Sequence, residues 1–342
     1  TVKSISDDST NSILSFEYEG VGVSGKFIAT PSSGNLGKYS YDGTNWVSFN
    51  LPSSGDWYNL ASGEFTFVAI KYNSDEAASS TDGITWTARS MPALRNWTGV
   101  AYGSGIFVAI ADDTNVGAYS LNGTTWINTT IPGFGDSTLN EWVDITYGKN
   151  RFVAIANSGN TAAVGTWNGT TLTWAPTLMD VSEDSSALDW QSVAYGNQRF
   201  VAISSTGQVA YSVDGTSWLP ATMPSQDGST AHFWRRIRYG QGVFFAIGNT
   251  GARDIGGDVS ISPTTFAATS YDGVHWTPRL LAQPANWAAL AFGNPDVTLD
   301  DSSISNNRPM WVLLSEDFTS QGCKVLTGAR ALGRCIVESG RI

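Results

Sequence analysis

Few residues in this chain combine the types and the spacing that catalysis requires. Hydrolysis of a glycosidic bond uses two carboxylates held at a fixed separation in a cleft. The tryptophan-led segments described below, which we expect to line the axis of the molecule, offer few carboxylates: Glu17, Glu19 and Asp144. No two of them can be nominated as an acid–base pair. We therefore expect no catalytic residue and no enzymatic activity.

Other motifs of catalysis or metal binding are absent from the sequence. There is no G-x-x-x-x-G-K-S/T and no H-E-x-x-H, and His232 and His275 are isolated residues. Acidic pairs could hold Ca²⁺ together with backbone carbonyls, but solvated loops are the expected interpretation. We predict no cofactor and no metal site. The acidic pairs are Asp112–Asp113, Glu183–Asp184 and Asp300–Asp301.

Two cysteines, Cys323 and Cys335, are too few for a disulfide scaffold, and with two histidines in the chain they make no zinc site. A hairpin centred on Ala329 would place the two cysteines opposite each other. Two free, buried thiols are equally compatible with the sequence, so the question of a bridge stays open.

The composition indicates a β-rich protein with an aromatic core. The 342 residues include 36 Gly, 14 Trp, 12 Tyr and 15 Phe, and only 14 % are charged. The net charge of -11 predicts no binding to nucleic acid or to anionic membranes. No apolar run reaches the roughly 18 residues of a membrane span, and the first residues do not resemble a signal peptide. Without an initiating Met, the chain is expected to be processed or part of a longer one.

A turn followed by a tryptophan occurs six times. One copy reads YSYDGTNW, and a longer copy reads VGTWNGTTLTW. Asp-Gly or Asn-Gly between two short strands is a strong hairpin signal, and a following Trp can bury a large apolar area in a stack of sheets. We refer to these turns as the boxes. Their residues are Asp42, Asp82, Asn122, Asn168, Asp214 and Asp272, followed by Trp46, Trp86, Trp126, Trp174, Trp218 and Trp276.

A second motif, W-x-x-V-A-Y-G followed by F-V-A-I, alternates with the boxes. Its apolar runs of four to seven residues predict strands. Gly103, Gly148, Gly196 and Gly240 end the first strand, where we expect a tight or left-handed backbone. We expect the leading tryptophans to pack between repeats, and Trp167 to make a local contact. The leading tryptophans are Trp57, Trp97, Trp142, Trp190, Trp234 and Trp287.

Four strands per repeat, at periods of about 40 to 58 residues, predict an all-β fold with the blades of a β-propeller. We expect one propeller over residues 1–342 with seven blades, at about 12–53, 54–94, 95–135, 140–180, 188–224, 232–284 and 285–342. The last repeat has no box, so six blades followed by a C-terminal β module is the alternative. The leading residues TVKSIS could add a strand that closes the ring.

The S-x-D-G-x-x-W pattern is similar to the Asp-box of sialidase-type propellers, although it is one residue shorter. Together with W-x-x-V-A-Y-G and F-V-A-I, it resembles repeats of bacteriophage tail and tail-fibre proteins. The ending TGARALGRCIVESGRI resembles a short β module of phage structural proteins, in which the chain continues past the point that corresponds to Ile342. The resemblance implies a virion protein, part of a larger homo- or hetero-oligomeric assembly in the tail.

The resemblance also makes a sialidase the natural enzymatic alternative. A sialidase needs several arginines that converge on the axis, a Tyr–Glu pair and an acidic Asp. Only one repeat supplies arginines there, as Arg235, Arg236 and Arg238 in WRRIRYG. The boxes recur once per blade, so they spread around a ring and we interpret them as architecture.

Loop lengths give the clearest indication of a binding surface. In an up-and-down sheet, the connections from strand 4 to the next strand 1 lie at the same end as those from strand 2 to strand 3. These connections vary in length, which is typical of recognition loops, although surface loops also tolerate idle insertions. The variable loops are Gly133–Glu141, Val181–Asp189, Ser225–Phe233 and Gly248–Thr265, with Phe134, Asp227, His232, Phe233, Arg253 and Asp254 as expected contacts.

We therefore expect a non-catalytic structural and recognition module of a virion, in a phage tail or tail fibre. Its partner would be a host surface glycan or another virion protein. The first alternative is a sialidase-like or other glycan-cleaving enzyme. The second is a cellular propeller for assembly or adhesion.

Overall fold

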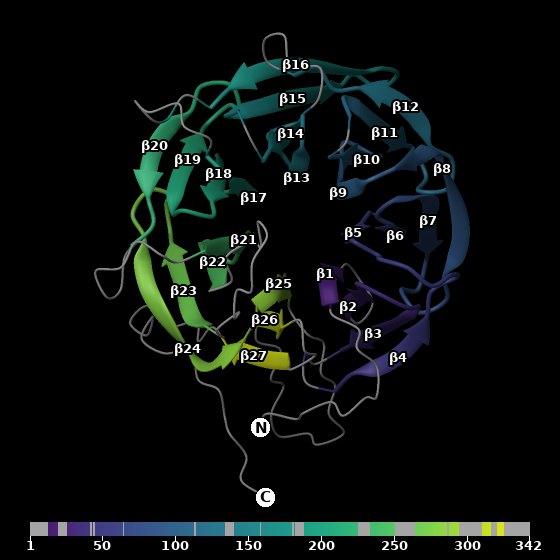
Figure 1. Ribbon diagram of the computed structural model, residues 1–342, viewed down its shortest axis with the longest axis horizontal. Coiled ribbons are helices and arrows are strands. Elements are labelled where there is room, and N and C mark those ends of the chain that lie inside the picture. The colour runs from purple at the N-terminus through teal and green to yellow at the C-terminus, as the bar shows by residue number, and fades with distance from the viewer. Residues whose placement is uncertain are drawn as a thin grey trace, which may run out of the picture.

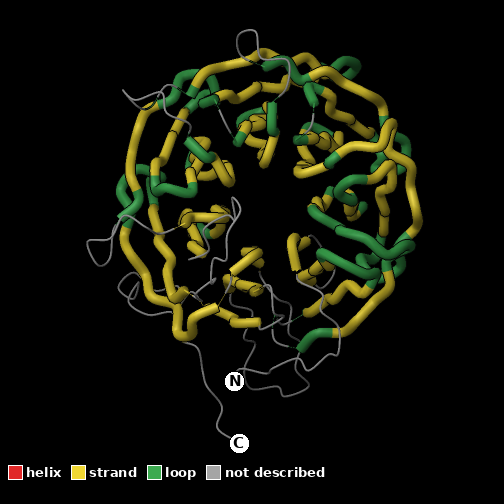
Figure 2. The backbone as a smooth tube through the Cα atoms, viewed as in Figure 1, coloured by secondary structure: helices red, strands yellow, loops and turns green. Residues whose placement is uncertain are grey.

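A computed structural model describes residues 13–19, 26–41, 43, 45–63, 65–112, 114–133, 140–157, 159–179, 181, 188–224, 233–249, 264–285, 287–293, 310–315 and 320–324. In Figure 2 these residues form strands joined by turns and loops. No helix in this part of the chain is long and apolar enough to cross a membrane.

Consecutive strands pair into antiparallel sheets that surround a common axis (Figure 1). The first three sheets each have four strands in chain order. The first contains β1 (Ile13–Glu19), β2 (Lys26–Pro31), β3 (Leu36–Ser40) and β4 (Val47–Asn50). The second contains β5 (Asn59–Ser62), β6 (Phe67–Ile70), β7 (Ser74–Ser80) and β8 (Thr87–Arg95). The third contains β9 (Trp97–Gly103), β10 (Ile106–Ala111), β11 (Val116–Ser120) and β12 (Ile127–Thr130).

The next three sheets repeat this order. The fourth contains β13 (Trp142–Gly148), β14 (Arg151–Ala156), β15 (Thr161–Trp167) and β16 (Leu172–Leu178). The fifth contains β17 (Trp190–Gly196), β18 (Arg199–Ser204), β19 (Gln208–Ser212) and β20 (Leu219–Thr222). The sixth contains β21 (Phe233–Gly240), β22 (Val243–Asn249), β23 (Thr264–Ser270) and β24 (Thr277–Ala285).

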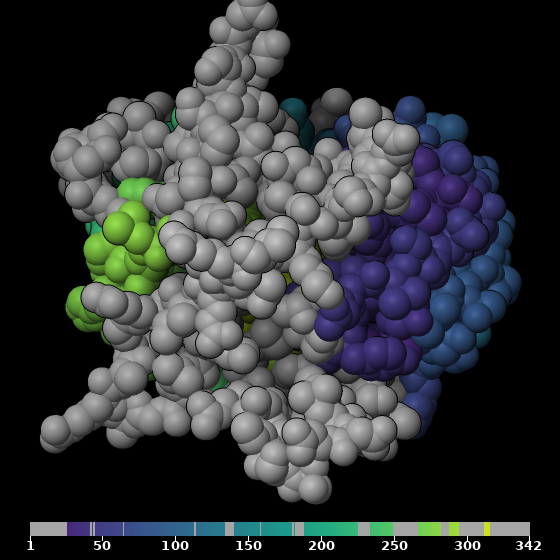
Figure 3. Space-filling view, turned by 90° about the horizontal axis from the view of Figure 1, so that it is seen from below, coloured from purple at the N-terminus to yellow at the C-terminus, as the bar shows by residue number. Residues whose placement is uncertain are grey.

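A shorter sheet completes the ring. It contains β25 (Trp287–Gly293), β26 (Met310–Ser315) and β27 (Ser320–Lys324). β25 packs against both β21 and β1, so this sheet lies between the sixth and the first. In the edge-on view of Figure 3, the first sheet (purple) lies on the right and the sixth (green) on the left. The predicted β-propeller is confirmed. Its described residues form six complete four-stranded blades and a three-stranded sheet near the C-terminus, so the alternative of six blades followed by a C-terminal β module fits them better than seven four-stranded blades.

The first strand of each sheet is innermost and the last is outermost. The chain enters the first strand at the leading Trp, at the same end as the connections between second and third strands; we name this end the loop face. The boxes connect third and fourth strands at the other end, the box face. The loop face and the box face lie at opposite ends of the same sheets, so ligands at the two faces would contact different residues.

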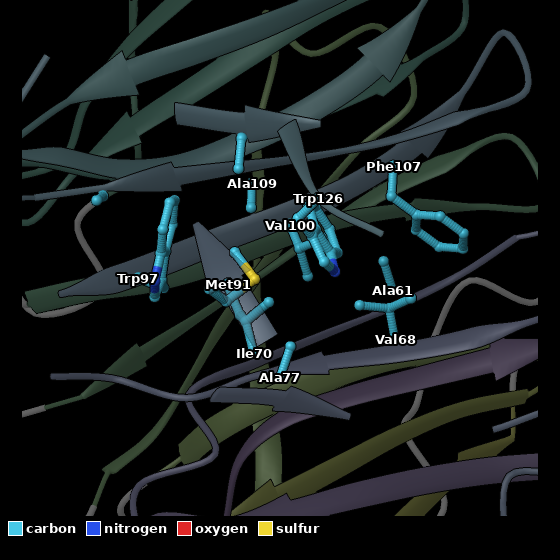
Figure 4. Close-up of a cluster of buried hydrophobic side chains, with 12 residues drawn as sticks. Ala61, Val68, Ile70, Ala77, Met91, Trp97, Val100, Phe107, Ala109 and Trp126 are labelled. Atoms are coloured by element: carbon cyan, nitrogen blue, oxygen red, sulfur yellow. The ribbon is translucent and has the colours of Figure 1, made fainter. Parts of the chain in front are cut away.

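The core consists of apolar side chains between neighbouring blades. In Figure 4, Ile70, Ala77 and Met91 of the second blade face Trp97 and Val100 of the third. Trp57, Trp97, Trp142, Trp190 and Trp287 are completely buried, and Trp234 nearly so. The leading tryptophans thus pack between blades, and they are not available at the surface for stacking on a ligand.

The glycines that end the first strands have a different role from the one expected. The left-handed backbone lies after them, at residues such as Ser104, Lys149 and Asn197. A Cβ added at Gly148 would lie 2.0 Å from the ring of Tyr195, which belongs to the next blade. Such a distance is far inside van der Waals contact, so these glycines make room for an aromatic ring of the neighbouring blade.

Each box is closed by its own hydrogen bonds. In the second blade, the carboxylate of Asp82 accepts from the backbone N–H groups of Ile84 and Thr85 at 2.8 and 2.7 Å. The hydroxyl of Ser80 accepts from Gly83 N–H at 2.8 Å, and Gly83 has a φ of 69°, which favours glycine. The same pattern occurs at Asn122, Asp214 and Asp272, and Asn168 accepts the two backbone bonds.

The box tryptophans differ in burial. Trp86, Trp126 and Trp218 are buried, whereas Trp46, Trp174 and Trp276 are half-buried. The structure places Trp167, at the end of β15, against Tyr119 of the preceding blade, with ring centroids 5.6 Å apart. This residue therefore contributes to inter-blade packing.

We predict that Trp218→Ala lowers the free energy of unfolding by about 3 to 5 kcal/mol, because it removes a large buried side chain from a close-packed interface. Urea denaturation would measure the loss. Leu219→Ala is the matched control, because Leu219 is next to Trp218 and its side chain is 56 % exposed. This substitution should change the free energy of unfolding by less than about 0.5 kcal/mol. Equal stability of Trp218→Ala and the parent would contradict the packing described here.

Candidate functional site

Polar side chains gather near the axis on three neighbouring innermost strands. β13, β17 and β21 contribute Asp144, Ser192, Arg236 and Arg238. In each strand, the pairing with the second strand shifts between the leading Trp and the residue two positions later. Such a bulge re-aims side chains. The Trp can then pack between blades while the residue two positions later turns towards the next innermost strand.

Asp144 is the central acceptor of this cluster, and its side chain is only 2 % exposed. Its Oδ2 atom accepts hydrogen bonds from Ser192 Oγ at 2.6 Å and from Val193 N–H at 3.0 Å. Its Oδ1 atom accepts from Ile145 N–H at 3.0 Å. A buried carboxylate with this many donors is held in one position.

Arg238 reaches this carboxylate from two blades away. Its Nη1 atom lies 3.4 Å from Asp144 Oδ2 and 3.3 Å from Ser192 Oγ, and it donates to the carbonyl of Ile237 at 2.9 Å. Three acceptors therefore fix one nitrogen of the guanidinium. The side chain remains 32 % exposed, and in the described part of the chain its other two nitrogens have no hydrogen bond.

Arg236 lies on the same strand and is half-buried. Burial lowers its pKa, and the neighbouring positive charges of Arg238 and Arg235 act in the same direction, while Asp144 and Tyr58 oppose the shift. Within the residues that the structure describes, no carboxylate forms an ion pair with Arg236. Since arginine does not lose its proton in proteins, a positive charge without a direct counter-ion lies near the axis.

Tyr58 approaches Arg236 from the second blade. It directly precedes the innermost strand β5, and it is close enough to influence the pKa of Arg236. Its ring packs on Tyr72, with centroids 5.4 Å apart, and the Tyr72 hydroxyl donates to Asp112 Oδ2 at 3.3 Å. Tyr58 and Tyr72 therefore form an aromatic pair that is held in place by the hydrogen bond to Asp112.

The groups of this cluster can be compared with those that a glycosidase requires. A glycosidase needs one carboxyl to give up a proton and another to attack or to activate water. Asp144 is engaged by four donors, and no second carboxylate of the described residues contacts the cluster. Two guanidinium groups, one of them anchored, can instead hold an anionic group by charge-assisted hydrogen bonds.

Most residues expected at the loop face lie outside the described residues. These are Phe134, Asp227, His232, Arg253 and Asp254, so their expected role remains a prediction. Phe233 is described: it begins β21, is half-buried and pairs with Asn249. It lies two residues before Arg235 and thus at the edge of the axial cluster.

The boxes remain separate from this cluster. Asp82, Asn122, Asn168, Asp214 and Asp272 each lie at the box face of a different blade, and Asp42 is outside the described residues. Although partial burial opposes ionisation, the backbone N–H groups of Thr85 and Ile84 and the Ser80 hydroxyl lower the pKa of Asp82 to about 2. Against the same opposition from burial, equivalent backbone bonds lower the pKa of Asp214, and the His275 side chain together with backbone N–H groups lowers the pKa of Asp272.

Metal ligands do not gather in the described part of the chain, where no group of three His, Cys, Asp or Glu residues could hold an ion. Of the acidic pairs considered above, only Asp112 is described. Cys323 lies on β27 opposite Trp311, and Cys335 is outside the described residues, so the question of a bridge stays open.

Sequence reasoning identified Asp144 and the three arginines, but it missed Ser192 and Tyr58. The two residues after each leading Trp differ from repeat to repeat, whereas the third is always Val, Ile or Leu. Aligning the repeats on that Trp would have shown these two variable positions. The second of them holds Asn59, Gly99, Asp144, Ser192, Arg236 and Ala289.

Comparisons with known proteins support the fold. No protein-family model matches the chain, and no curated protein matches it. A catalytically inactive virginiamycin B lyase from Staphylococcus aureus, solved with quinupristin, is similar with a TM-score of 0.71 and 10 % identity, over 93 % of this chain and 97 % of that one. A streptogramin B lyase gives a TM-score of 0.68 and 11 % identity, over 92 % and 93 % of the two chains.

YCF48 from Cyanidioschyzon merolae is similar with a TM-score of 0.62 and 14 % identity, over 93 % of this chain and 97 % of that chain. At such identities the similarity shows the propeller fold alone. These structural matches do not test the more specific resemblance of the sequence to Asp-box and phage repeats.

A further ionisable group lies at the loop face, directly before the buried Trp57. The Oδ1 atom of Asp56 is buried and has no hydrogen-bond partner. Burial raises the pKa of this carboxyl from 3.8 to about 6. At the equivalent position of the fifth blade, Asp189 instead accepts hydrogen bonds from Asn157 and Gln191.

We predict that stability decreases as the pH rises from about 4 to 6, because folded Asp56 binds a proton that the unfolded chain has already lost. Asp56→Asn should raise the free energy of unfolding above pH 7 by about 1 to 2 kcal/mol, less than the full shift because solvent reaches the side chain. It should change little at pH 4. Asp75→Asn, at an exposed aspartate of β7, is the control in urea denaturation at both pH values. An equal effect of Asp56→Asn at both pH values would contradict the assignment.

Proposed function

We propose that this chain is a non-catalytic recognition propeller of a phage tail or tail fibre. It binds a host surface glycan or another virion protein at its loop face. The observation that carries the proposal is the environment of the axial carboxylate: Asp144 is buried and hydrogen-bonded by four donors, while Arg236 and two nitrogens of Arg238 have no hydrogen-bond partner among the described residues. An arrangement of this kind supports binding of a ligand better than proton transfer to it.

The architecture supports the same proposal. The box turn of the second blade is closed by hydrogen bonds between its own residues, which is typical of a structural turn. The long connections between β12 and β13, β16 and β17, β20 and β21, and β22 and β23 all leave the sheets at the loop face. A rigid ring with its variation at one end is typical of recognition modules. The assignment to a phage tail rests on the resemblance of the repeats.

The structural neighbours cover two kinds of activity. Virginiamycin B lyase is an enzyme, and another structure of YCF48, similar with a TM-score of 0.52 and 16 % identity, is bound to D1 peptide. The same fold thus serves catalysis and peptide binding, so the choice must be made from the site. The binding function is favoured here because the described axial residues lack a pair of carboxylates in contact. A sialidase-like or other glycan-cleaving enzyme and a cellular assembly propeller are the alternatives.

The enzymatic alternative has a direct test. We expect no release of reporter from sialosides or from common glycosides, because no converging acid pair is present among the described axial residues. Purified protein would be assayed across pH 4 to 8 with a known sialidase as positive control. Turnover that disappears in Arg236→Gln would contradict the binding function and support the enzyme.

The position of the binding face has a separate test. Replacing Asp254–Pro263 with the short turn Ser205–Gly207 of the fifth blade should weaken binding to whole host cells, or incorporation into the particle, at least about tenfold. Asp214→Asn is the matched change at the box face, where Asn122 already shows that an amide oxygen can accept the same bonds. Folded Asp214→Asn should bind like the parent. Loss of binding in this variant, with retention in the loop variant, would place the functional surface on the box face.

A further inference from the structure

Arg236 and Arg238 lie on one strand and are held in different ways. Arg238 is anchored by one nitrogen to Asp144, Ser192 and the Ile237 carbonyl. Arg236 has no hydrogen bond or ion pair within the described part of the chain, although it is half-buried. Partial burial of a cation without a direct counter-ion costs free energy, and such a group persists in a folded protein most readily when it has a use.

The charges of the cluster define the ligand that fits. Arg236 and Arg238 are positive and Asp144 is negative, so these three groups leave one positive charge, to which Arg235 of the same strand adds its own. An anionic group, such as a carboxylate or a sulfate ester, offsets this positive charge. Because the net charge of the protein is -11, the protein as a whole does not attract an anionic ligand. The attraction has to come from the arginines of the cluster.

The aromatic pair Tyr58 and Tyr72 indicates the rest of the ligand. Tyr58 lies close to Arg236, and its ring is braced by Tyr72, which is itself hydrogen-bonded to Asp112. Small-molecule sites commonly combine aromatic surface with a few placed polar groups. A sugar ring fits this combination, because it has an apolar face for a tyrosine and can carry its acidic group towards the guanidinium groups.

We propose that the axial cluster is a binding site for an acidic saccharide, whose carboxylate or sulfate ester pairs with Arg236 and Arg238. Asp144 and Ser192 are positioning residues, since they fix Arg238. Arg236 contacts the anion, and Tyr58 packs on the sugar ring. The inference deepens the proposed recognition function, because it names the chemical class of one ligand and the residues that take it.

The test is titration of the whole chain with sodium glucuronate, glucose 6-sulfate and glucose, followed by calorimetry or NMR. Glucuronate and glucose 6-sulfate should bind, and glucose should bind at least about tenfold more weakly, because it lacks the charge-assisted bonds. Raising the NaCl concentration from 20 to 500 mM should weaken binding of the two anions, and screening should leave glucose unaffected.

Variants separate a ligand contact from a structural role. Arg236→Gln should weaken glucuronate binding at least about tenfold while the melting temperature stays equal or rises, because it removes a cation that lacks a direct counter-ion. Arg279→Gln is the matched control in the same blade: its Nε atom lies 3.0 Å from Thr269 Oγ1 on the outer strands, and its loss should leave binding unchanged. Tyr58→Ala should weaken glucuronate and glucose alike.

Several results would overturn the inference. Glucose binding as tightly as glucuronate, unchanged affinity in Arg236→Gln, or no binding of either acidic sugar would remove the anion site. N-acetylglycine carries a carboxylate on a peptide-like group without a sugar ring. If it bound more tightly than glucuronate, the ligand of this site would not be a saccharide. If the acidic sugars fail to bind while the loop replacement still abolishes attachment to cells, the inference falls and the proposed recognition function stands.

Discussion

The structure depends on one contact that is repeated around the ring: an aromatic side chain of one blade fills space left by a glycine of its neighbour. The ring of Tyr195 occupies the position that a side chain at Gly148 would need, and Tyr239 does the same at Gly196. A single four-stranded sheet has two apolar faces and cannot bury them alone. Each blade is therefore stable only between two others, and the fully buried leading tryptophans mark the same interfaces nearer the loop face.

This requirement separates what is constant in the repeat from what can vary. Trp, Val, Tyr and Gly of the first strand face neighbouring blades, so their sizes are fixed by packing. The bulge after the Trp frees one position per blade from that demand. The fourth, fifth and sixth blades use this position for Asp144, Ser192 and Arg236, and the seventh sheet uses it for Ala289. The polar cluster thus replaces residues at one variable position of three blades. The packing of the repeated blades determines where this position lies.

The sequence was sufficient to predict the fold because each repeated segment contains local signals for its own strands and turns. Asp-Gly turns, short apolar runs and regular spacing predicted the propeller and the strands of its blades. The role of Gly148 was misjudged, because a glycine after a strand usually indicates backbone conformation, and nothing local reveals a tyrosine one blade away. Contacts such as Arg238 with Asp144, 94 residues apart, depend on how the ring closes and could not be read from spacing.

The axial cluster also shows why the arginines of one blade need not imply the chemistry of a sialidase. Glycoside hydrolysis would require two carboxylates, and Asp144 is the one carboxylate of the described residues in this cluster, where its oxygens accept hydrogen bonds from Ile145, Ser192 and Val193. The same donors stabilise the position of Arg238, because Ser192 and Asp144 share its Nη1 atom. Arg236 receives no such support from the described residues, yet it lies next to a cation and close to Tyr58 of the aromatic pair. Packing alone would favour an uncharged side chain at this position, so the charge is best explained by a ligand that completes it.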